Sequence, residues 1–361
     1  MHVAIDARAA SEVPAGRGRY VRELLRALAA RDDDHRYDLI ARTPWGGSLD
    51  ERFRWRCFPG TDPWWPLGVG PRLGRVDVTL ATNSYLFAVT APRPTVAFVH
   101  DMVVFDPESR PPAGAAAERV TLPLAVRRAT AFACNSGATR DALVARFPAV
   151  AGRTVVTPLG VDQTLAAQAT RGGDVVARLR LPQRYVLSVG TREPRKNLVR
   201  AIAAFAELPA DVRAERRLVI VGHPGWDDAE IDTALRDAGD LVHLAGFVDD
   251  ADLPAVYAAA DAFVYVSFHE GFGLPVLEAM AVGTPVVTSN VSSLPEVAGD
   301  AALTVDPRSV PAIRDALSRV LSDGGLAASL IERGTRRATA YSWARTADTT
   351  LALLADARKG R

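Results

Sequence analysis

The chain has 361 residues, of which 48% are hydrophobic, and its 43 basic residues nearly balance its 42 acidic ones, leaving a net charge of +1. A chain of this length exceeds one ordinary hydrophobic core, so we expect two domains. The balanced charge gives no electrostatic case for nucleic-acid binding.

The two cysteines, Cys57 and Cys134, lie far apart and have no His or Cys neighbour at the spacing of a metal site. We expect both to be reduced and buried. No run of about twenty apolar residues occurs, and the N-terminus enters a strand without a basic leader. The sequence therefore predicts a cytoplasmic protein, and it leaves open a peripheral contact with the inner face of the cytoplasmic membrane.

The N-terminal part begins with a short apolar strand at residues 2–6 and continues with an amphipathic helix at residues 18–30. Gly16 and Gly18 lie between them. A glycine-rich turn after the first strand of an α/β domain lies at the carboxyl edge of the sheet, where such folds bind ligands. A plain turn from strand to helix is an equally good interpretation of these glycines.

Further short strands are predicted at residues 37–41, 53–58 and 77–81, and the alternating polarity of 53–58 is typical of an edge strand. Trp64 and Trp65 stand among prolines, in a stretch that favours neither helix nor strand. As a functional pair they would stack on an acceptor sugar or enter a membrane interface. As a structural pair they would pack a loop onto the domain.

His100 and Asp101 follow directly after a buried strand at residues 95–99, at the edge of the sheet where chemistry is expected. A histidine in this position is also often a hydrogen-bonded structural residue. After it, strands and helices continue to alternate, with a helix between 115 and 128, strands at 131–134 and 154–156, and a helix ending near 146.

Residues 163–178 contain glycines, alanines and few large apolar side chains, which is typical of a linker. Beyond them, enough chain separates successive strands for a helix each time, which predicts βαβ units and a parallel sheet. These strands are predicted at 185–189, 218–221, 242–244, 262–266 and 285–288.

The most informative stretch is 268–280, which follows the buried strand at 262–266. Its glycines precede a helix whose first position suits Pro275, so unpaired backbone N–H groups and the positive end of a helix dipole meet there. That combination predicts an anion site. Glu270 and Glu278 frame it and would repel a lone phosphate, so we expect a ligand with phosphate in the middle and hydroxyls at both ends, such as a sugar nucleotide.

This stretch resembles the signature of the retaining glycosyltransferases of family 4, in which two glutamates are separated by seven residues around the wording GFGLPVLEAMA. The resemblance implies that Glu270 faces the hydroxyls of the donor sugar and that Glu278 binds the ribose diol. It also implies that the loop at Gly271, Phe272, Gly273 and Leu274 holds the diphosphate through backbone amides. In a purely structural interpretation, Glu278 favours the helix N-terminus and Glu270 is an ordinary loop residue.

The family resemblance implies the GT-B architecture, an α/β fold in which two Rossmann-like domains with doubly wound parallel sheets face each other across a cleft. We expect an N-terminal, acceptor-side domain at residues 1–170 and a C-terminal domain that binds the nucleotide sugar at 180–338. Residues 339–361 are expected to form a helix that crosses back to the N-terminal domain.

The resemblance also implies roles for residues outside the signature. Lys196 and an arginine, either Arg195 or Arg192, would stabilise the charge that gathers on the leaving diphosphate. His100 would lie beside the donor sugar and acceptor, with Asp101 on the acceptor side. Four further residues are expected near the donor phosphates or the nucleotide base: Gly16, Gly18, Gly222 and Phe247.

We therefore predict a retaining, hexosyltransferase-type enzyme that moves a sugar from a nucleoside-diphosphate sugar to a glycan, lipid-linked or small-molecule acceptor. Mannosyltransferase-like polysaccharide biosynthesis is one setting, and natural-product biosynthesis is another. No cofactor or metal is expected, because the Asp-rich stretches at 32–34 and 250–252 suit a connection and a helix N-terminus.

Other functions compete with this prediction. The same architecture serves nucleotide-sugar epimerases and sugar phosphorylases, and a nucleotide-sugar sensor or scaffold would keep the fold without catalysis. A dinucleotide dehydrogenase is disfavoured, because the first turn lacks the full glycine fingerprint of such enzymes.

Overall fold

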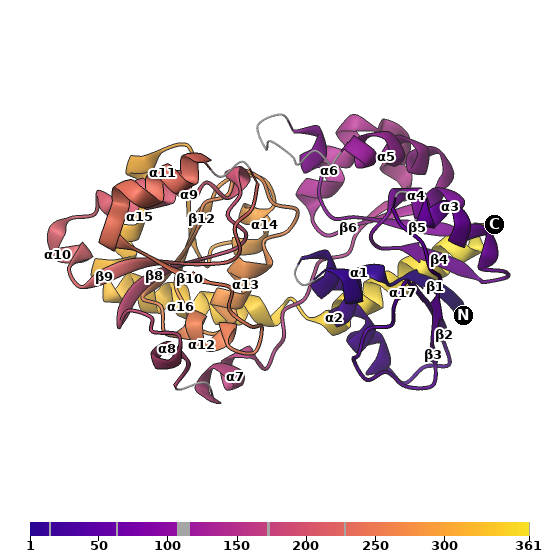
Figure 1. Ribbon diagram of the computed structural model, residues 1–361, viewed down its shortest axis with the longest axis horizontal. Coiled ribbons are helices and arrows are strands. Elements are labelled where there is room, and N and C mark those ends of the chain that lie inside the picture. Colours follow the sequence, from indigo (N-terminus) through magenta and orange to yellow (C-terminus); the bar gives the residue numbers. More distant parts are fainter. Residues whose placement is uncertain (14–15, 63, 107–115, 172–173, 227–228, 361) are drawn as a thin grey trace. The chain divides into compact units, whose positions relative to one another are not determined.

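The computed structural model describes residues 1–13, 16–62, 64–106, 116–171, 174–226 and 229–360. They form two compact units. Of these residues, unit 1 contains those within 1–105, 116–160 and 343–360, and unit 2 contains Asp106 and those within 161–342. Each unit has a parallel sheet with helices on both faces, which confirms the predicted pair of Rossmann-like domains (Figure 1).

The described part of unit 1 contains a seven-stranded sheet in the order β3-β2-β1-β4-β5-β6-β7. Each pair of neighbouring strands is parallel, and the central strands are buried along their whole length because helices cover both faces. The strands are β1 (His2–Asp6), β2 (Arg36–Ala41), β3 (Phe53–Cys57), β4 (Val78–Ala81), β5 (Thr95–Val99), β6 (Ala131–Cys134) and β7 (Thr154–Val156).

Two groups of helices cover the sheet of unit 1. Helix α17 (Trp343–Lys359) packs against α2 (Arg17–Ala29) and strands β4 to β6, whereas α4 (Tyr85–Thr90) contacts both α3 (Trp65–Val69) and α5 (Ala116–Arg128) (Figure 1). The amphipathic helix predicted near residues 18–30 is α2, and it buries Val21, Leu24, Leu25 and Leu28. The other helices are α1 (Arg8–Glu12), α6 (Gly137–Arg146), η1 (Gly70–Arg72), η2 (Val103–Phe105) and η5 (Pro148–Arg153).

The described part of unit 2 contains a six-stranded sheet in the order β10-β9-β8-β11-β12-β13, again parallel throughout. Its core joins the sheet to helices α9 (Leu198–Ala206) and α15 (Val310–Ser322) through side chains such as Val264, Phe205 and Leu317. The strands are β8 (Arg184–Val189), β9 (Arg216–Val221), β10 (Val242–Gly246), β11 (Ala262–Tyr265), β12 (Val286–Ser289) and β13 (Leu303–Val305).

The helices of unit 2 form two layers, with α9, α11 and α15 on one face of the sheet and α12, α13 and α16 on the other (Figure 1). Their bounds are α7 (Leu165–Arg171), α8 (Val175–Arg178), η6 (Pro194–Lys196), α9 (Leu198–Ala206), α10 (Ala210–Arg213), α11 (Ala229–Ala238), η7 (Gly239–Leu241), α12 (Leu253–Ala258), α13 (Leu274–Ala281), α14 (Leu294–Ala298), α15 (Val310–Ser322) and α16 (Gly324–Thr339).

Three local expectations differ from the structure. The predicted linker contains helices α7 and α8, which pack on α12 because Leu165 and Val175 are buried anchors in an alanine-rich stretch. Trp65 begins helix α3, since Pro66 is tolerated in a first helical turn. Cys57 is exposed rather than buried, because it ends the edge strand β3, whereas Cys134 is buried as expected.

Helix length and polarity also bear on membrane association. Across the described ranges, we find no helix that combines the length and apolar character needed to span a bilayer.

Candidate active site

The best candidate site lies where the strand order of unit 2 reverses. From β8 the chain winds outward through β9 and β10, and it then returns to β11, on the other side of β8. Such a reversal opens a crevice at the carboxyl ends of the two central strands, and α/β sheets bind ligands there. The loops at 190–197 and 266–273 leave β8 and β11 at this point.

Backbone and amide hydrogen bonds join the two loops. The Phe268 N–H donates to the carbonyl of Arg195 at 2.8 Å, and the Asn197 side-chain amide donates to the carbonyls of Val266 at 3.0 Å and Pro307 at 2.7 Å. Asn197 has a left-handed backbone, with φ of 57°, which asparagine tolerates better than most residues. The two loops are therefore held in one arrangement.

A buried carboxylate lies at the centre of these loops. The Nζ atom of Lys196 is 2.6 Å from Oε1 of Glu270, and Nη1 of Arg195 is 2.9 Å from Oε2. The hydroxyl of Tyr265 is 2.8 Å from Oε1. Arg195 also pairs with the carboxylate of Glu193, which is itself buried. Charges that the sequence places far apart are thus gathered around Glu270.

Electrostatics keep this centre ionised. Burial alone would raise the pKa of Glu270, but the charges of Arg195 and Lys196 outweigh it and hold that pKa well below its ordinary value. Burial, and then the charge of Arg195, lower the pKa of Lys196, while Glu270 opposes that shift. Glu270 is therefore a carboxylate at neutral pH, with two cations beside it.

The loop after Glu270 is fixed by serines that precede α14. The Ser292 hydroxyl accepts from the Glu270 N–H at 3.1 Å and lies 2.6 Å from its carbonyl oxygen. The Ser293 hydroxyl lies within 2.9 Å of the same carbonyl oxygen and 2.7 Å of that of Phe272. Gly273 has a φ of 108°, and a Cβ there would lie 2.7 Å from the side chain of Leu294. Only glycine fits this position without strain.

Helix α13 begins directly after Gly273, and among the described residues no side chain caps it. Its first backbone N–H groups and the positive end of its dipole are thus directed at the end of the signature loop. Phe272 is buried, whereas Gly271 is partly exposed. Glu278 lies about one turn into the helix and is buried, and its Oε2 accepts a hydrogen bond from the Tyr257 hydroxyl at 3.1 Å.

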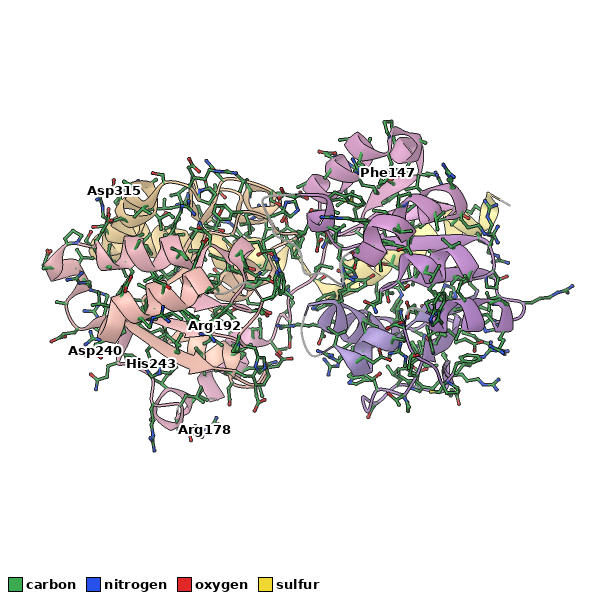
Figure 2. All side chains as sticks on the ribbon, turned by 45° about the horizontal axis from the view of Figure 1, so that its top comes forward. Phe147, Arg178, Arg192, Asp240, His243 and Asp315 are labelled. Atoms are coloured by element: carbon green, nitrogen blue, oxygen red, sulfur yellow. The ribbon has the colours of Figure 1, made fainter. Side chains whose placement is uncertain are left out.

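Arg195, rather than Arg192, accompanies Lys196 at this centre. The guanidinium of Arg192, labelled in Figure 2, lies 3.8 Å from the carboxylate of Asp232 in α11. The structure therefore brings Glu270, Lys196 and Arg195 together and leaves Arg192 on the side of β9 and α11.

Gly222 and Phe247 follow the ends of β9 and β10. A Cβ at Gly222 would lie 2.1 Å from the carbonyl oxygen of Gly190, so glycine here lets the ends of β8 and β9 approach closely. Phe247 is 52% exposed, and its ring stacks on His223 with centroids 4.8 Å apart. This pair presents an aromatic surface at the carboxyl edge of the sheet.

In unit 1, His100 is buried at the end of β5. Its Nε2 lies 2.7 Å from the carbonyl of Thr82, and the carbonyl of His100 accepts from the Asn135 side chain at 2.7 Å. Burial and the charge of Arg17 lower the pKa of His100 to about 3, so the ring is neutral at physiological pH. Because a carbonyl only accepts, Nε2 carries the proton and Nδ1 keeps its lone pair.

Asp101 has a local structural contact, since its carboxylate accepts from the Val103 N–H at 3.1 Å. Gly16 precedes α2 with a φ of 53°. A Cβ at Gly18 would lie 1.7 Å from the carbonyl oxygen of Val13, so close packing alone requires this glycine.

The two tryptophans have different environments. Trp65 is 3% exposed, its indole N–H donates to the carbonyl of Phe58 at 2.7 Å, and Arg8 lies over its ring. This matches the structural interpretation of the pair for Trp65. Trp64 is 69% exposed and keeps a free aromatic surface.

The part of the chain that the structure describes contains no group of three or more His, Cys, Asp or Glu side chains arranged to hold a metal ion.

Several residues of this centre were not predicted from the sequence. Tyr265 is the last residue of β11, and its hydroxyl contacts Glu270. Because Tyr265 belongs to an apolar run, the sequence does not suggest a polar role for it. Four further residues make loop contacts that the sequence pattern does not reveal: Glu193, Asn197, Ser292 and Ser293. One signal was available for Tyr265, because the last residue of a parallel strand lies at the functional edge of its sheet.

Two family models match the chain. The family model described as "Glycosyl transferases group 1" matches residues 176–337, and that described as "Glycosyltransferase Family 4" matches residues 14–165. Together they span most of both units.

Two relatives illustrate the sequence similarity. O-antigen chain mannosyltransferase B of Escherichia coli is 45% identical over 164 residues, which is 45% of this chain and 43% of that protein. D-inositol 3-phosphate glycosyltransferase of Actinosynnema mirum is 33% identical over 251 residues, 64% of this chain and 59% of that protein. The chain thus covers about half of the length of these relatives.

Solved structures resemble the whole chain in fold. Sucrose-phosphate synthase from Thermosynechococcus elongatus has a TM-score of 0.80 at 22% identity, with all of both chains covered. HepE of Anabaena, crystallised with UDP and glucose, has a TM-score of 0.77 at 18% identity, covering 99% of this chain and 100% of that one.

Proposed function

The chain belongs to the family 4-like glycosyltransferases, and from this premise we propose that it transfers a sugar from a nucleoside-diphosphate sugar to an acceptor hydroxyl with retention of configuration. The observation that carries the proposal is the buried carboxylate of Glu270, held by Lys196 and Arg195 in front of helix α13. A fixed negative charge next to fixed positive charges suits a reaction that separates charge along a bond.

In the proposed donor complex, the diphosphate lies against the N-terminus of α13, where backbone N–H groups and the helix dipole favour an anion. Lys196 and Arg195 stabilise the charge that builds on the leaving diphosphate. Glu278 accepts hydrogen bonds from the ribose diol, and Glu270 faces the transferred sugar. The acceptor attacks from the face that the diphosphate leaves, and the leaving phosphate takes the proton of the acceptor.

In this proposal His100 of unit 1 contacts the acceptor. His100 is neutral there, and its Nδ1 is a hydrogen-bond acceptor held in place by the Thr82 contact at Nε2. A neutral imidazole can accept a hydrogen bond from an acceptor hydroxyl without contributing a positive charge. Asp101 and the exposed Trp64 remain candidates for contacts with the acceptor.

We propose that catalysis needs no metal ion, since Lys196, Arg195 and the helix dipole together neutralise the two phosphates. Excess EDTA should therefore leave most of the transfer rate intact in the purified protein. Complete loss of transfer, restored by Mg²⁺ or Mn²⁺, would contradict this part of the proposal.

The donor base and sugar are best identified by binding. A thermal-shift panel of UDP, GDP, ADP, dTDP and their sugars should single out one nucleotide, because a ligand that binds only the native state stabilises it by RT ln(1 + [L]/Kd). GDP-mannose is the first donor to test, because the E. coli relative is named a mannosyltransferase. The exposed Phe247–His223 stack is the proposed contact for the base.

Transfer is then assayed with the selected donor and glycan, lipid-linked and small-molecule acceptors. Product with the anomeric configuration of the donor supports the proposal. Turnover without an acceptor would favour an epimerase, and turnover with free phosphate would favour a phosphorylase. Tight donor binding without transfer or hydrolysis would favour a sensor.

We further propose that unit 1 contacts an anionic membrane surface. Helices α3 and α5 both contact α4. Four large apolar side chains on or beside these two helices are exposed, namely Trp64, Leu67, Val120 and Leu124. Arg72 at the end of η1 and Arg127 and Arg128 at the end of α5 are also exposed. Apolar side chains with arginines nearby suit an interface of anionic headgroups.

Vesicle flotation tests this contact. The protein should float with vesicles that contain anionic phospholipid and not with purely zwitterionic ones, and a Trp64→Ser/Val120→Ser variant should float less. Equal recovery of both proteins would contradict the proposal.

A further inference from the structure

The hydroxyl of Tyr265 closes a triangle of polar atoms at the centre of the site. It lies 2.6 Å from Nζ of Lys196 and 2.8 Å from Oε1 of Glu270, and those two atoms are 2.6 Å apart. Tyr265 ends β11, Lys196 lies in the loop after β8, and Glu270 lies in the loop after β11. The triangle therefore spans the two strands at which the sheet order reverses.

The chemistry of the three groups fixes the direction of each hydrogen bond. The Lys196 ammonium can only donate, so the Tyr265 oxygen accepts from it, and the Tyr265 O–H donates to Glu270. Burial, and then the negative charge of Glu270, raise the pKa of Tyr265 well above its ordinary value. The hydroxyl keeps its proton and acts as a neutral link between a cation and an anion.

The Tyr265 hydroxyl affects how Lys196 and Glu270 can move apart. In the proposed reaction Lys196 serves the diphosphate and Glu270 serves the sugar, yet a direct ion pair holds them together. Tyr265 gives Lys196 a neutral acceptor and gives Glu270 a neutral donor. Each charged group thus keeps a fixed hydrogen-bond partner when Lys196 turns toward a phosphate.

We propose that Tyr265 is a positioning residue for sugar transfer, which holds Lys196 and Glu270 in place for their separate roles. The inference rests on the proposed function. It names a residue that acts through its neighbours, and the sequence signature does not contain it.

The competing explanation is that Tyr265 makes an ordinary buried hydrogen bond. Tyr185 provides the comparison, because it is also buried in the same sheet and its hydroxyl donates to the carbonyl of Val256 at 2.6 Å. Tyr185 lies near the start of β8, at the opposite end of the strand from the site. Tyr→Phe at either position removes one buried hydroxyl and its hydrogen bonding.

The experiment compares Tyr265→Phe with Tyr185→Phe in the full chain. For each variant we would measure the melting temperature, kcat and KM for the donor, Kd for the free nucleoside diphosphate, and kcat/KM against pH. We expect Tyr265→Phe to lower kcat about tenfold and to change the nucleotide Kd by less than about threefold. Tyr185→Phe should lower the melting temperature and leave kcat unchanged.

The pH profile separates positioning from folding. The charged and titratable groups around Lys196 are Arg195 and Glu193 from its own loop, Tyr265 from β11, and Glu270 after β11. Removing the Tyr265 oxygen removes an acceptor that favours the ammonium form. The pKa of Lys196 should fall further, so the basic limb of kcat/KM should move to lower pH in Tyr265→Phe alone.

Wild-type kcat and an unmoved basic limb in Tyr265→Phe would overturn the inference. The inference would also be overturned if both variants lost activity in proportion to the decrease in their melting temperatures. If the wild type binds the diphosphate but transfers no sugar, the proposed function fails separately. In that case the pH dependence of diphosphate binding tests the role of Tyr265. An unchanged basic limb in Tyr265→Phe would again overturn the inference.

Discussion

Glu270 is surrounded by three side chains that stabilise its negative charge. This buried charge distinguishes a catalytic role of Glu270 from a role in ligand binding alone. Lys196, Arg195 and Tyr265 all contact its carboxylate oxygens, so its charge is maintained at a cost in desolvation. A binding protein would need hydrogen-bond acceptors at this place, but it would not need a buried charge.

Glu270→Gln tests this distinction, because it keeps the shape of the side chain and removes its charge. We expect the variant to bind the free nucleoside diphosphate almost as the wild type does, and to transfer sugar roughly 10²-fold more slowly. Calorimetric titration and a transfer assay measure the two quantities. Loss of nucleotide affinity would instead make Glu270 a structural part of the phosphate loop.

The lowered pKa of Glu270 also predicts how folding stability depends on pH. The unfolded chain has the ordinary pKa of 4.5 and the folded chain a much lower one, so the native state stabilises the carboxylate. This contribution is fully present above about pH 4.5 and is lost as the pH falls toward the folded pKa.

The measurement is the free energy of unfolding in denaturant, at several pH values from 7 to 3, for the wild type and Glu270→Gln. The difference between the two proteins should be constant near neutrality and should shrink below about pH 4.5. A difference that grows on acidification would mean that Glu270 is not stabilised as a carboxylate.

The placement of Arg192 and Arg195 predicts different effects for the basic residues. Lys196→Ala and Arg195→Ala should each lower kcat by roughly 10²–10³, because in the proposed donor complex their charges lie where the diphosphate charge develops. Arg192→Ala is the matched control, since Arg192 lies near Asp232 and should leave kcat within about threefold. A large loss of kcat in Arg192→Ala would assign the second phosphate contact to Arg192 instead.

Sequence reasoning reached part of this centre. The order strand, glycine loop, helix places Glu270 and Glu278 at the carboxyl edge, because a parallel strand must end there. The choice between Arg192 and Arg195 depends on the turn η6 at Pro194–Lys196 and on the hydrogen bonds of Asn197, and sequence spacing does not contain either.

Among the elements, the strands were more predictable than the short helices. Strands covered on both faces form apolar runs, and the chain between them is long enough for a helix each time. Helices α7 and α8 were missed because their stretch of chain has few large apolar residues, and they are stabilised by tertiary contacts of Leu165 and Val175. Packing against α12 therefore stabilises the helical conformation of these residues, which their local composition does not predict.

The glycine pair at the ends of β8 and β9 gives a prediction for these elements. Gly222→Ala would place a Cβ 2.1 Å from the carbonyl oxygen of Gly190, at a φ of 141°. Because backbone would have to move, we expect destabilisation by several kcal/mol and weaker donor binding.

Gly246→Ala is the control for backbone strain alone. It has a positive φ of 69°, but a Cβ there meets no heavy atom within 4 Å. It should cost only about 1 kcal/mol. Denaturant unfolding of both variants measures the difference, and equal costs would show that the close approach of Gly190 and Gly222 contributes nothing.

For the whole molecule, the C-terminal helix links the end of the chain to its beginning. Helix α17 belongs to unit 1, although the chain has passed through unit 2 before reaching it. It buries Trp343, Leu351 and Leu354 against α2 and strands β4 to β6. Sequence alone identified a helix here, and the family resemblance supplied its destination.

Removal of residues 343–361 should therefore unfold unit 1 selectively. The large apolar side chains that α17 buries contribute about 1.5–3 kcal/mol each, and together they approach the total stability of about 5–15 kcal/mol of an ordinary domain. Unit 2 has its own core, built from α9, α15 and its sheet, and it should stay folded.

Scanning calorimetry of the full and shortened chains tests this prediction, with and without the nucleoside diphosphate that the binding panel selects. The shortened chain should keep one transition, and the nucleotide should raise its midpoint because the proposed donor contacts Glu270, Lys196 and α13 all lie in unit 2. A shortened chain with no transition would show that unit 2 depends on unit 1 for stability. One that keeps the full unfolding enthalpy would show that α17 adds little to the core of unit 1.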